Sequence, residues 1–262
     1  MNTSDFKKIK VQYEQAGAIV RLTLNAPKAN VLDAKMMQEI TEAVIMLSTD
    51  KNLKALLIEG EGKHFSFGAS VSEHTKEKAG DMLNTFHEMF HRLRDLSVPV
   101  ISLISGQCLG GGFELALFAH FMFADRSASM GVPEIKLGVF PPPASIFLPL
   151  KIGTGYANSL LLTGESITAD RAYEMGLLQA VFADNEAMQS GVNDFIEKEI
   201  LPKSASSLKI ATAASRMFFN HIMDVFLNQL QQFYINGLME THDANEGIQA
   251  FLENRPPEWK NE

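Results

Sequence analysis

Short apolar segments recur along the first 145 residues, and their periods predict strands. Residues 8–25 alternate apolar and polar positions, which indicates two short strands joined near Gly17. The compact apolar segments 53–62 and 98–106 are typical of strands buried on both faces of a parallel sheet. One further strand is expected over 121–130, before a turn that is rich in proline.

Segments with helical spacing separate these strands. Asp33 is the expected N-cap of a helix over about 34–48, a second helix is expected from about 76 to 94, and a third begins near Gly111. This alternation predicts an α/β fold with a layered core. In such a fold, the loops at the strand ends carry the chemistry.

After residue 145 the pattern becomes mostly helical. Glycines first interrupt the helical segments, and residues 202–252 then read as almost continuous helix. We therefore predict a core that holds the site over residues 1–200 and a helical region over 201–262. The apolar segment "MFFNHIMDVFLNQLQQFYING" in this region is expected to pack on a neighbouring subunit or to fold back over the core.

Composition and charge exclude several classes of protein. The net charge of -8 and the absence of a concentrated basic surface argue against nucleic-acid binding. The single cysteine, Cys108, excludes an intrachain disulfide and a cysteine-rich zinc site, and a small buried residue is expected there. The polar N-terminus lacks the core of a signal peptide, and no apolar run approaches the roughly 20 residues that cross a bilayer. We expect a cytoplasmic protein with no membrane partner.

One carboxylate stands alone in an apolar helix. The segment "GQCLGGGFELALFAH" (106–120) places Glu114 on the same helix face as Leu117, Phe118 and Phe121. Such a carboxyl has a raised pKa if it is buried, while its place near the helix start opposes that rise and suits proton transfer. Glu114 on an exposed helix edge is the alternative.

The glycines at 110–112 allow backbone to approach a ligand closely. A helix that begins at Gly111 directs free N–H groups toward an oxygen that becomes negative. Tight packing of helix against strand explains the glycines equally well, but it does not explain Glu114.

Two other segments extend this hypothesis. Glu134 follows a proline in the loop "VPEIKLG", and with Glu114 it supplies the two carboxylates that acid–base chemistry on one small substrate needs. The loop "FSFGASV" (65–71) can present a second backbone N–H, although a simple turn is the alternative.

The string "HEMFH" (87–91) matches a helical zinc-protease pattern, because histidines at i and i+4 share a helix face. Chance histidines that face solvent are the preferred interpretation, since no further ligand follows, and we expect no metal site. No phosphate-binding Gly-Lys-Ser/Thr loop and no dinucleotide fingerprint occur in the sequence.

Taken together, the segments resemble the crotonase (enoyl-CoA hydratase/isomerase) superfamily along essentially the whole chain. The resemblance is carried, in order, by "LTLNAPKANVLD", "FSFGAS", "GQCLGGGFELAL", "PEIKLGVFPP", "LLLTGESITADRAYEMGLLQAVF" and "GIQAFLENRPPEWK". It implies repeated β-β-α units and a helical C-terminal region that assembles homotrimers or dimers of trimers and covers the CoA site. It also implies an acyl-CoA thioester substrate and no separate cofactor, because coenzyme A is part of the substrate.

The resemblance also implies roles for individual residues. The N–H groups of Ala69 and Gly111 would bind the thioester oxygen, and Glu114 and Glu134 would be the catalytic pair of a hydratase. Lys28 and Ala29 would lie beside the CoA, and Lys260 would reach a neighbour's CoA phosphate. The remaining contacts expected with CoA or substrate are Ser66, Gly68, Ser70, Val71, Gly110, Pro133 and Phe140.

Two departures from common hydratases concern the acyl pocket. Ser70 replaces the usual acid of the first loop, and "FPPPAS" replaces a glycine-rich turn after Glu134. This combination is most similar to hydratases of anaerobic aromatic degradation that act on cyclohexa-1,5-diene-1-carbonyl-CoA. The alternatives are a straight-chain enoyl-CoA hydratase, a double-bond isomerase, and a non-catalytic member of the fold that binds acyl-CoA or RNA.

Overall fold

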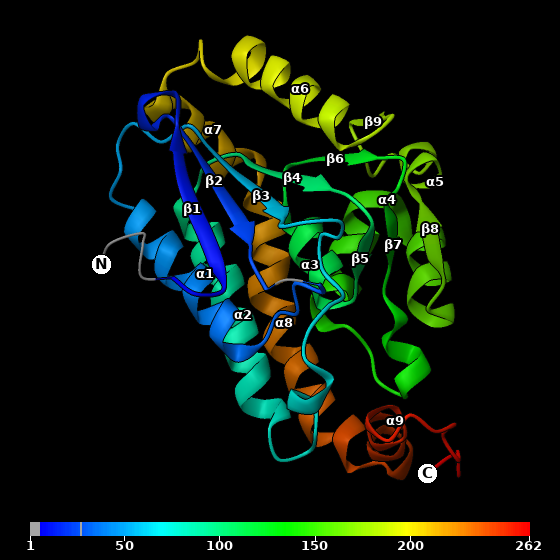
Figure 1. Ribbon diagram of the computed structural model, residues 1–262. Coiled ribbons are helices and arrows are strands. Elements are labelled where there is room, and N and C mark those ends of the chain that lie inside the picture. The colour runs from blue at the N-terminus through cyan, green and yellow to red at the C-terminus, as the bar shows by residue number, and fades with distance from the viewer. Residues whose placement is uncertain (1–5, 27) are drawn as a thin grey trace.

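Two β-sheets and the helices around them form the structure, a computed structural model that describes residues 6–26 and 28–262 (Figure 1). The strands are β1 (Ile9–Glu14), β2 (Ile19–Leu24), β3 (Ala55–Gly60), β4 (Val100–Ile104), β5 (Gln107–Leu109), β6 (Phe121–Asp125), β7 (Ser129–Gly131), β8 (Ser166–Thr168) and β9 (Ala180–Phe182). The helices are α1 (Ala34–Leu47), α2 (Ala79–Leu96), α3 (Gly111–Phe118), α4 (Pro142–Thr163), α5 (Ala169–Glu174), α6 (Asn185–Phe195), α7 (Ala205–Ser215), α8 (Met217–Asn236) and α9 (His242–Leu252). Single turns of 3-10 or π helix are η2 (Gln15–Gly17), η3 (Val71–Glu73), η4 (Pro133–Leu137), η5 (Ile196–Ile200) and η6 (Leu238–Glu240).

The larger sheet has the strand order β1-β2-β3-β4-β6-β9. Its first pair is the antiparallel hairpin expected from the alternating N-terminal segment, and all the other neighbours are parallel. Leu56 and Ile58 of β3 belong to the main core, whereas Leu57 packs in a second cluster that includes α6. The strand is therefore buried on both faces, as its compact apolar sequence predicted.

Strand, short strand and helix follow one another as a repeated unit. After β4 the chain forms β5, which pairs in a second sheet with the order β5-β7-β8, and then enters α3. The prediction of one strand over 121–130 is wrong, because this segment forms two strands, β6 and β7, that lie in different sheets. The carboxylate of Asp125 accepts the N–H of Ser127 at 2.8 Å, and this local turn separates the two strands.

The helices after residue 201 include one that returns to the core. Helix α8 packs beside α2 and α4 and buries Met223, Leu227 and Tyr234 (Figure 1). Its other side exposes Phe226 and Phe233. The division of the chain at residue 200 stays a prediction. Within residues 6–26 and 28–262, no helix combines the length and apolar character needed to cross a membrane.

Candidate active site

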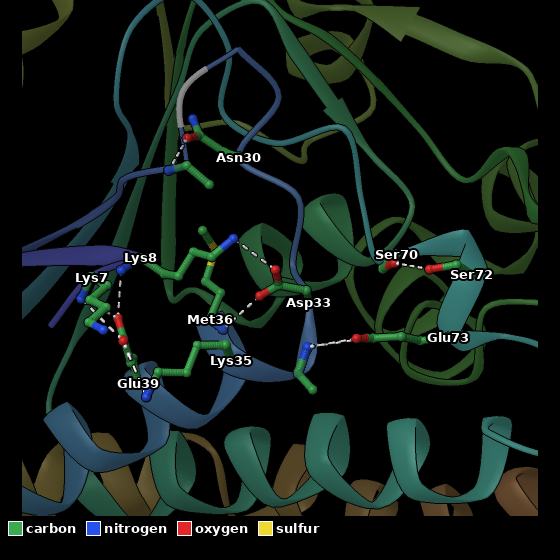
Figure 2. A network of polar contacts seen from close by, with 12 residues as sticks. Lys7, Lys8, Asn30, Asp33, Lys35, Met36, Glu39, Ser70, Ser72 and Glu73 are labelled. Carbon is green, nitrogen blue, oxygen red and sulfur yellow. Dashed lines mark hydrogen bonds and ion pairs between the residues drawn. The ribbon is translucent and has the colours of Figure 1, made fainter.

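Polar side chains fix the segment that leads into α1 (Figure 2). Oδ1 of Asp33 accepts the N–H of Met36 at 2.9 Å, which confirms Asp33 as the N-cap. The carboxylate of Glu73 accepts the N–H of Ala34 at 3.1 Å. Since Glu73 lies in η3, which begins at Val71 at the end of the loop 66–71, this bond ties that loop to the start of α1.

The loop 66–71 runs beside this segment and leaves one backbone donor unused. The N–H of Leu32 donates to Gly68 O at 2.9 Å, and the N–H of Ser70 donates to Leu32 O at 3.3 Å. These two bonds form the bridge between Leu32 and the loop, and they lie on either side of Ala69. The bridge therefore uses neither the N–H nor the C=O of Ala69 itself. The N–H of Ala69 donates to no acceptor in the described part of the chain.

The first residues of α3 approach this loop closely. A Cβ on Gly111 would lie 3.1 Å from the nitrogen of Ala69. Gly110 has a φ of +49°, and a Cβ there would lie 2.6 Å from Oε1 of Glu134. The positive φ of Gly110 therefore favours glycine there, and a Cβ on Gly111 would be closer to Ala69 than ordinary contacts are. The N–H of Gly111, like that of Ala69, has no acceptor among the described residues.

Ser66 is the first residue of the loop 66–71. It is fully buried, its Oγ donates to Asn30 O at 2.7 Å, and the N–H of Gly68 donates to the same Oγ at 3.1 Å. A Cβ on Gly112 would come within 2.5 Å of Ser66 Cβ. Packing thus explains Gly112. Ser66 does not line the cavity described next, and its contact with substrate stays a prediction.

One cavity gathers most of the residues that the sequence singled out. These are Gly68, Ala69, Val71, Gly110, Gly111, Glu114, Pro133, Glu134 and Phe140. Four of the other expected contacts, Lys28, Ala29, Ser70 and Lys260, lie outside its lining. Lys28 and Lys260 are exposed, so neither has a position fixed by packing.

Glu114 is buried, with 3% of its surface exposed, so the alternative of an exposed helix edge is wrong. Its Oε1 accepts the N–H of Ala144 at 2.9 Å. Pro142 and Pro143 occupy the first two positions of α4 and carry no N–H, so Ala144 is the first donor of that helix. Burial and the neighbouring Glu134 raise the pKa of Glu114 well above its usual value, and the Ala144 bond opposes the rise.

Glu134 approaches the same space from η4, where Pro133 fixes the backbone before it. Its Oε2 is buried and has no hydrogen-bond partner in the described residues. Burial also raises the pKa of Glu134. Two neighbouring carboxyls with raised pKa values favour a state in which one is protonated and the other ionised, so the pair holds an acid and a base together.

Two polar cavity residues were not found from the sequence. His74 follows the loop, and Nδ1 of its ring bonds to Ser70 O at 2.8 Å. Tyr234 comes from α8, far along the chain. Its spacing from the buried Met223 and Leu227 marks one helix face, and this was the only available signal.

The "HEMFH" segment lies on α2. His87 is buried, so the expectation that both histidines face solvent is wrong for this residue. Across residues 6–26 and 28–262, no three His, Cys, Asp or Glu side chains come together in a group that could hold a metal ion. Cys108 is buried as expected, and burial raises the pKa of its thiol.

Comparisons with known proteins agree with this geometry. The family model described as "Enoyl-CoA hydratase/isomerase" matches residues 14–262. A cyclohexa-1,5-dienecarbonyl-CoA hydratase of Thauera aromatica is 39% identical over 253 residues, covering 97% of each chain. A probable enoyl-CoA hydratase of Bacillus subtilis is 32% identical, covering 92% of this chain and 95% of that protein. An enoyl-CoA hydratase structure from Mycobacterium avium subsp. paratuberculosis K-10 superposes with a TM-score of 0.85 at 22% identity, covering 97% and 99% of the two chains.

The fold is the crotonase fold of repeated β-β-α units, and the chain is a hydro-lyase of the enoyl-CoA hydratase type that acts on acyl-CoA thioesters. The chain belongs to the enoyl-CoA hydratase/isomerase family.

Proposed function

We propose that the chain adds water to cyclohexa-1,5-diene-1-carbonyl-CoA and forms 6-hydroxycyclohex-1-ene-1-carbonyl-CoA. The observation that carries the proposal is the buried pair of Glu114 and Glu134 in a cavity that also contains the backbone of Ala69 and Gly111. The choice of a cyclic acyl group is supported by the 39% identity to the Thauera aromatica hydratase over 97% of the chain.

The two unused backbone donors provide the electrostatic part of the mechanism. The thioester oxygen accepts the N–H groups of Ala69 and Gly111, which lie on adjacent segments. Negative charge builds on this oxygen as the thioester becomes an enolate. Donors fixed in advance stabilise that charge without reorganising, and the loss of one such donor costs about 3–4 kcal/mol.

The two carboxyls provide the proton transfers. One of them, ionised, takes a proton from water as the water oxygen bonds to the β-carbon. The electron pair of the attacked double bond passes into the conjugated system and onto the thioester oxygen. A proton from the carboxyl pair then reaches the far end of the dienolate, so that one water is added in total. The steps use only water and the thioester, so the reaction needs no separate cofactor.

The proline segment supports a substrate that differs from a straight chain. Pro141 and Pro142 line the cavity beside Val139 and Phe140. Proline fixes its own φ and has no N–H, so this wall is stiff and offers few donors. A rigid apolar wall suits a planar ring, which has no rotatable bonds to order on binding.

The CoA part of the substrate extends beyond this cavity. Lys28 and Ala29 are proposed to lie beside the adenine and pantetheine, and Lys260 is proposed to reach the CoA phosphate of a neighbouring subunit. This last role fits the proposed assembly into trimers or dimers of trimers, for which the exposed apolar side of α8 offers a surface.

A spectroscopic screen of enoyl- and dienoyl-CoA esters tests the proposal. The cyclic diene is expected to be hydrated with a higher kcat/KM than crotonyl-CoA, and water labelled with heavy oxygen should place the label in the product. An unlabelled product with a moved double bond would instead assign isomerisation. A preference for crotonyl-CoA would assign straight-chain hydration and reject the cyclic substrate.

A further inference from the structure

One further polar side chain lines the cavity that contains the two carboxyls. Tyr234 on α8 is 1% exposed and lines the same cavity as Glu114 and Glu134. Its ring packs edge-on against Phe140, with the ring centroids 5.4 Å apart. The ring is therefore held by apolar contacts, and the hydroxyl at its tip is the only polar atom of the side chain.

The hydroxyl of Tyr234 has no hydrogen-bond partner among the described residues. Burying an unsatisfied hydroxyl is unfavourable, whereas phenylalanine would keep the same ring contacts without that cost. Burial together with the charges of Glu134 and Glu114 raises the pKa of the phenol, so Tyr234 stays protonated and remains a donor.

We propose that Tyr234 is a third catalytic residue, whose hydroxyl donates a hydrogen bond to the oxygen atom that is added to the substrate. A water molecule between the carboxyls offers them its two hydrogens and has a lone pair left to accept from Tyr234. The inference rests on hydration at Glu114 and Glu134, but it does not depend on whether the acyl group is cyclic.

The hydroxyl of Tyr234 is expected to increase the rate of hydration because of how charge develops on the water oxygen. The water oxygen loses a proton to a carboxylate while its bond to the β-carbon forms, so it carries more negative charge in the transition state than in water or in the product alcohol. A hydrogen bond to that oxygen is therefore strongest in the transition state, which is the condition for lowering the barrier. In the reverse direction, the same donor stabilises the departing hydroxide.

Tyr234→Phe tests the proposal, with Tyr173→Phe as the matched control because Tyr173 is exposed on α5. For an ester that the unsubstituted chain hydrates, Tyr234→Phe is expected to lower kcat by about 10- to 100-fold, the effect of losing one hydrogen bond to a charging oxygen. The KM should change much less, and the control should keep the original kcat.

A binding measurement separates this inference from the proposed function. Measured in a Glu114→Gln background, which blocks turnover, the ratio of the Kd values for butyryl-CoA and 3-hydroxybutyryl-CoA reports recognition of the added oxygen. Tyr234→Phe is expected to reduce this preference for the hydroxyl by about 3- to 10-fold. An unchanged ratio overturns the proposal, whatever happens to kcat. If the ratio is unchanged and the pH profile of kcat shifts, the hydroxyl of Tyr234 acts on the carboxyls and not on the added oxygen. Failure of the unsubstituted chain to hydrate the cyclic diene rejects that substrate alone.

Discussion

The backbone N–H of Ala144 donates to Oε1 of Glu114 across 2.9 Å, although the two residues are 30 positions apart. The start of α4 therefore faces a carboxyl on α3. The helix end favours the ionised form of Glu114, while burial and Glu134 favour the protonated form, and the second effect is the larger. The result is a carboxyl of fixed orientation that keeps its proton at pH values where an exposed glutamate is ionised.

Replacing either carboxyl by its amide should nearly abolish hydration. Glu114→Gln and Glu134→Gln keep the size of the side chain but remove one proton-transfer group, and such groups contribute about 100- to 10,000-fold to the rate. We expect kcat to fall by that amount in steady-state assays, while the Kd for an unreactive acyl-CoA stays within a few-fold.

Glu197→Gln is the matched control, because Glu197 is exposed in η5. It should leave both kcat and Kd unchanged. Retention of full activity in both active-site variants would contradict the assigned roles of Glu114 and Glu134.

Glu114→Gln should also make the protein more stable at alkaline pH. Below the ordinary carboxyl pKa, Glu114 is protonated and uncharged in both the folded and the unfolded chain, so its ionisation does not affect stability. As the pH rises above that value, the unfolded chain loses the proton while the folded chain keeps it, because the folded pKa is raised. The free energy of unfolding then falls by up to about 1.4 kcal/mol per pH unit until the folded pKa is reached.

Glutamine has no such proton and can still accept the N–H of Ala144. Thermal denaturation at pH 5 and pH 8 should therefore show a Tm advantage of Glu114→Gln that grows with pH. An advantage that shrank as the pH rose would show that Glu114 ionises readily in the folded chain.

Gly110→Ala should impair the site without replacing a titratable group. The new Cβ would lie 2.6 Å from Oε1 of Glu134, and the φ of +49° is unfavourable for alanine, so Glu134 must move. A misplaced catalytic group can cost about 100-fold in rate. Gly155→Ala in α4 is the control, because a Cβ there meets nothing within 4 Å. Equal kcat values for the two variants would mean that the Gly110 contact does not position Glu134.

The exposed side of α8 predicts the assembly state. Phe233 is 73% exposed although it is a large apolar residue. If this face makes the proposed subunit contact, a charge there is costly, and Phe233→Glu should lower the mass seen by light scattering from that of the proposed trimer or hexamer toward that of one chain. Ile45→Glu, at an exposed position on α1, serves as the control. An unchanged mass for Phe233→Glu would exclude this face from the contact.

Much of the site followed from local sequence because its signals are local. A lone carboxylate in an apolar helix, three glycines before it and a proline before Glu134 are each a departure from ordinary packing. The structure brings Glu114 and Glu134 into one cavity as that reasoning expected.

The remaining features depend on contacts between distant segments. Tyr234 reaches the cavity only because α8 folds back beside α2 and α4, and no spacing in the sequence specifies that return. Ser66 has the sequence context of a contact residue, but its side chain is buried in close packing against Gly112. The division into β6 and β7 was missed because a single side-chain turn at Asp125 separates two strands in an otherwise continuous segment.

The proline segment at the start of α4 links the wall of the cavity to the carboxyl of Glu114. Pro141 and Pro142 form part of the acyl wall, and Ala144, two positions further on, holds the carboxyl of Glu114. A substitution that reshapes the wall also moves the donor that orients the acid. Substrate preference and the pKa of Glu114 are therefore expected to change together. A substitution that widens the substrate range should also alter the rate of proton transfer.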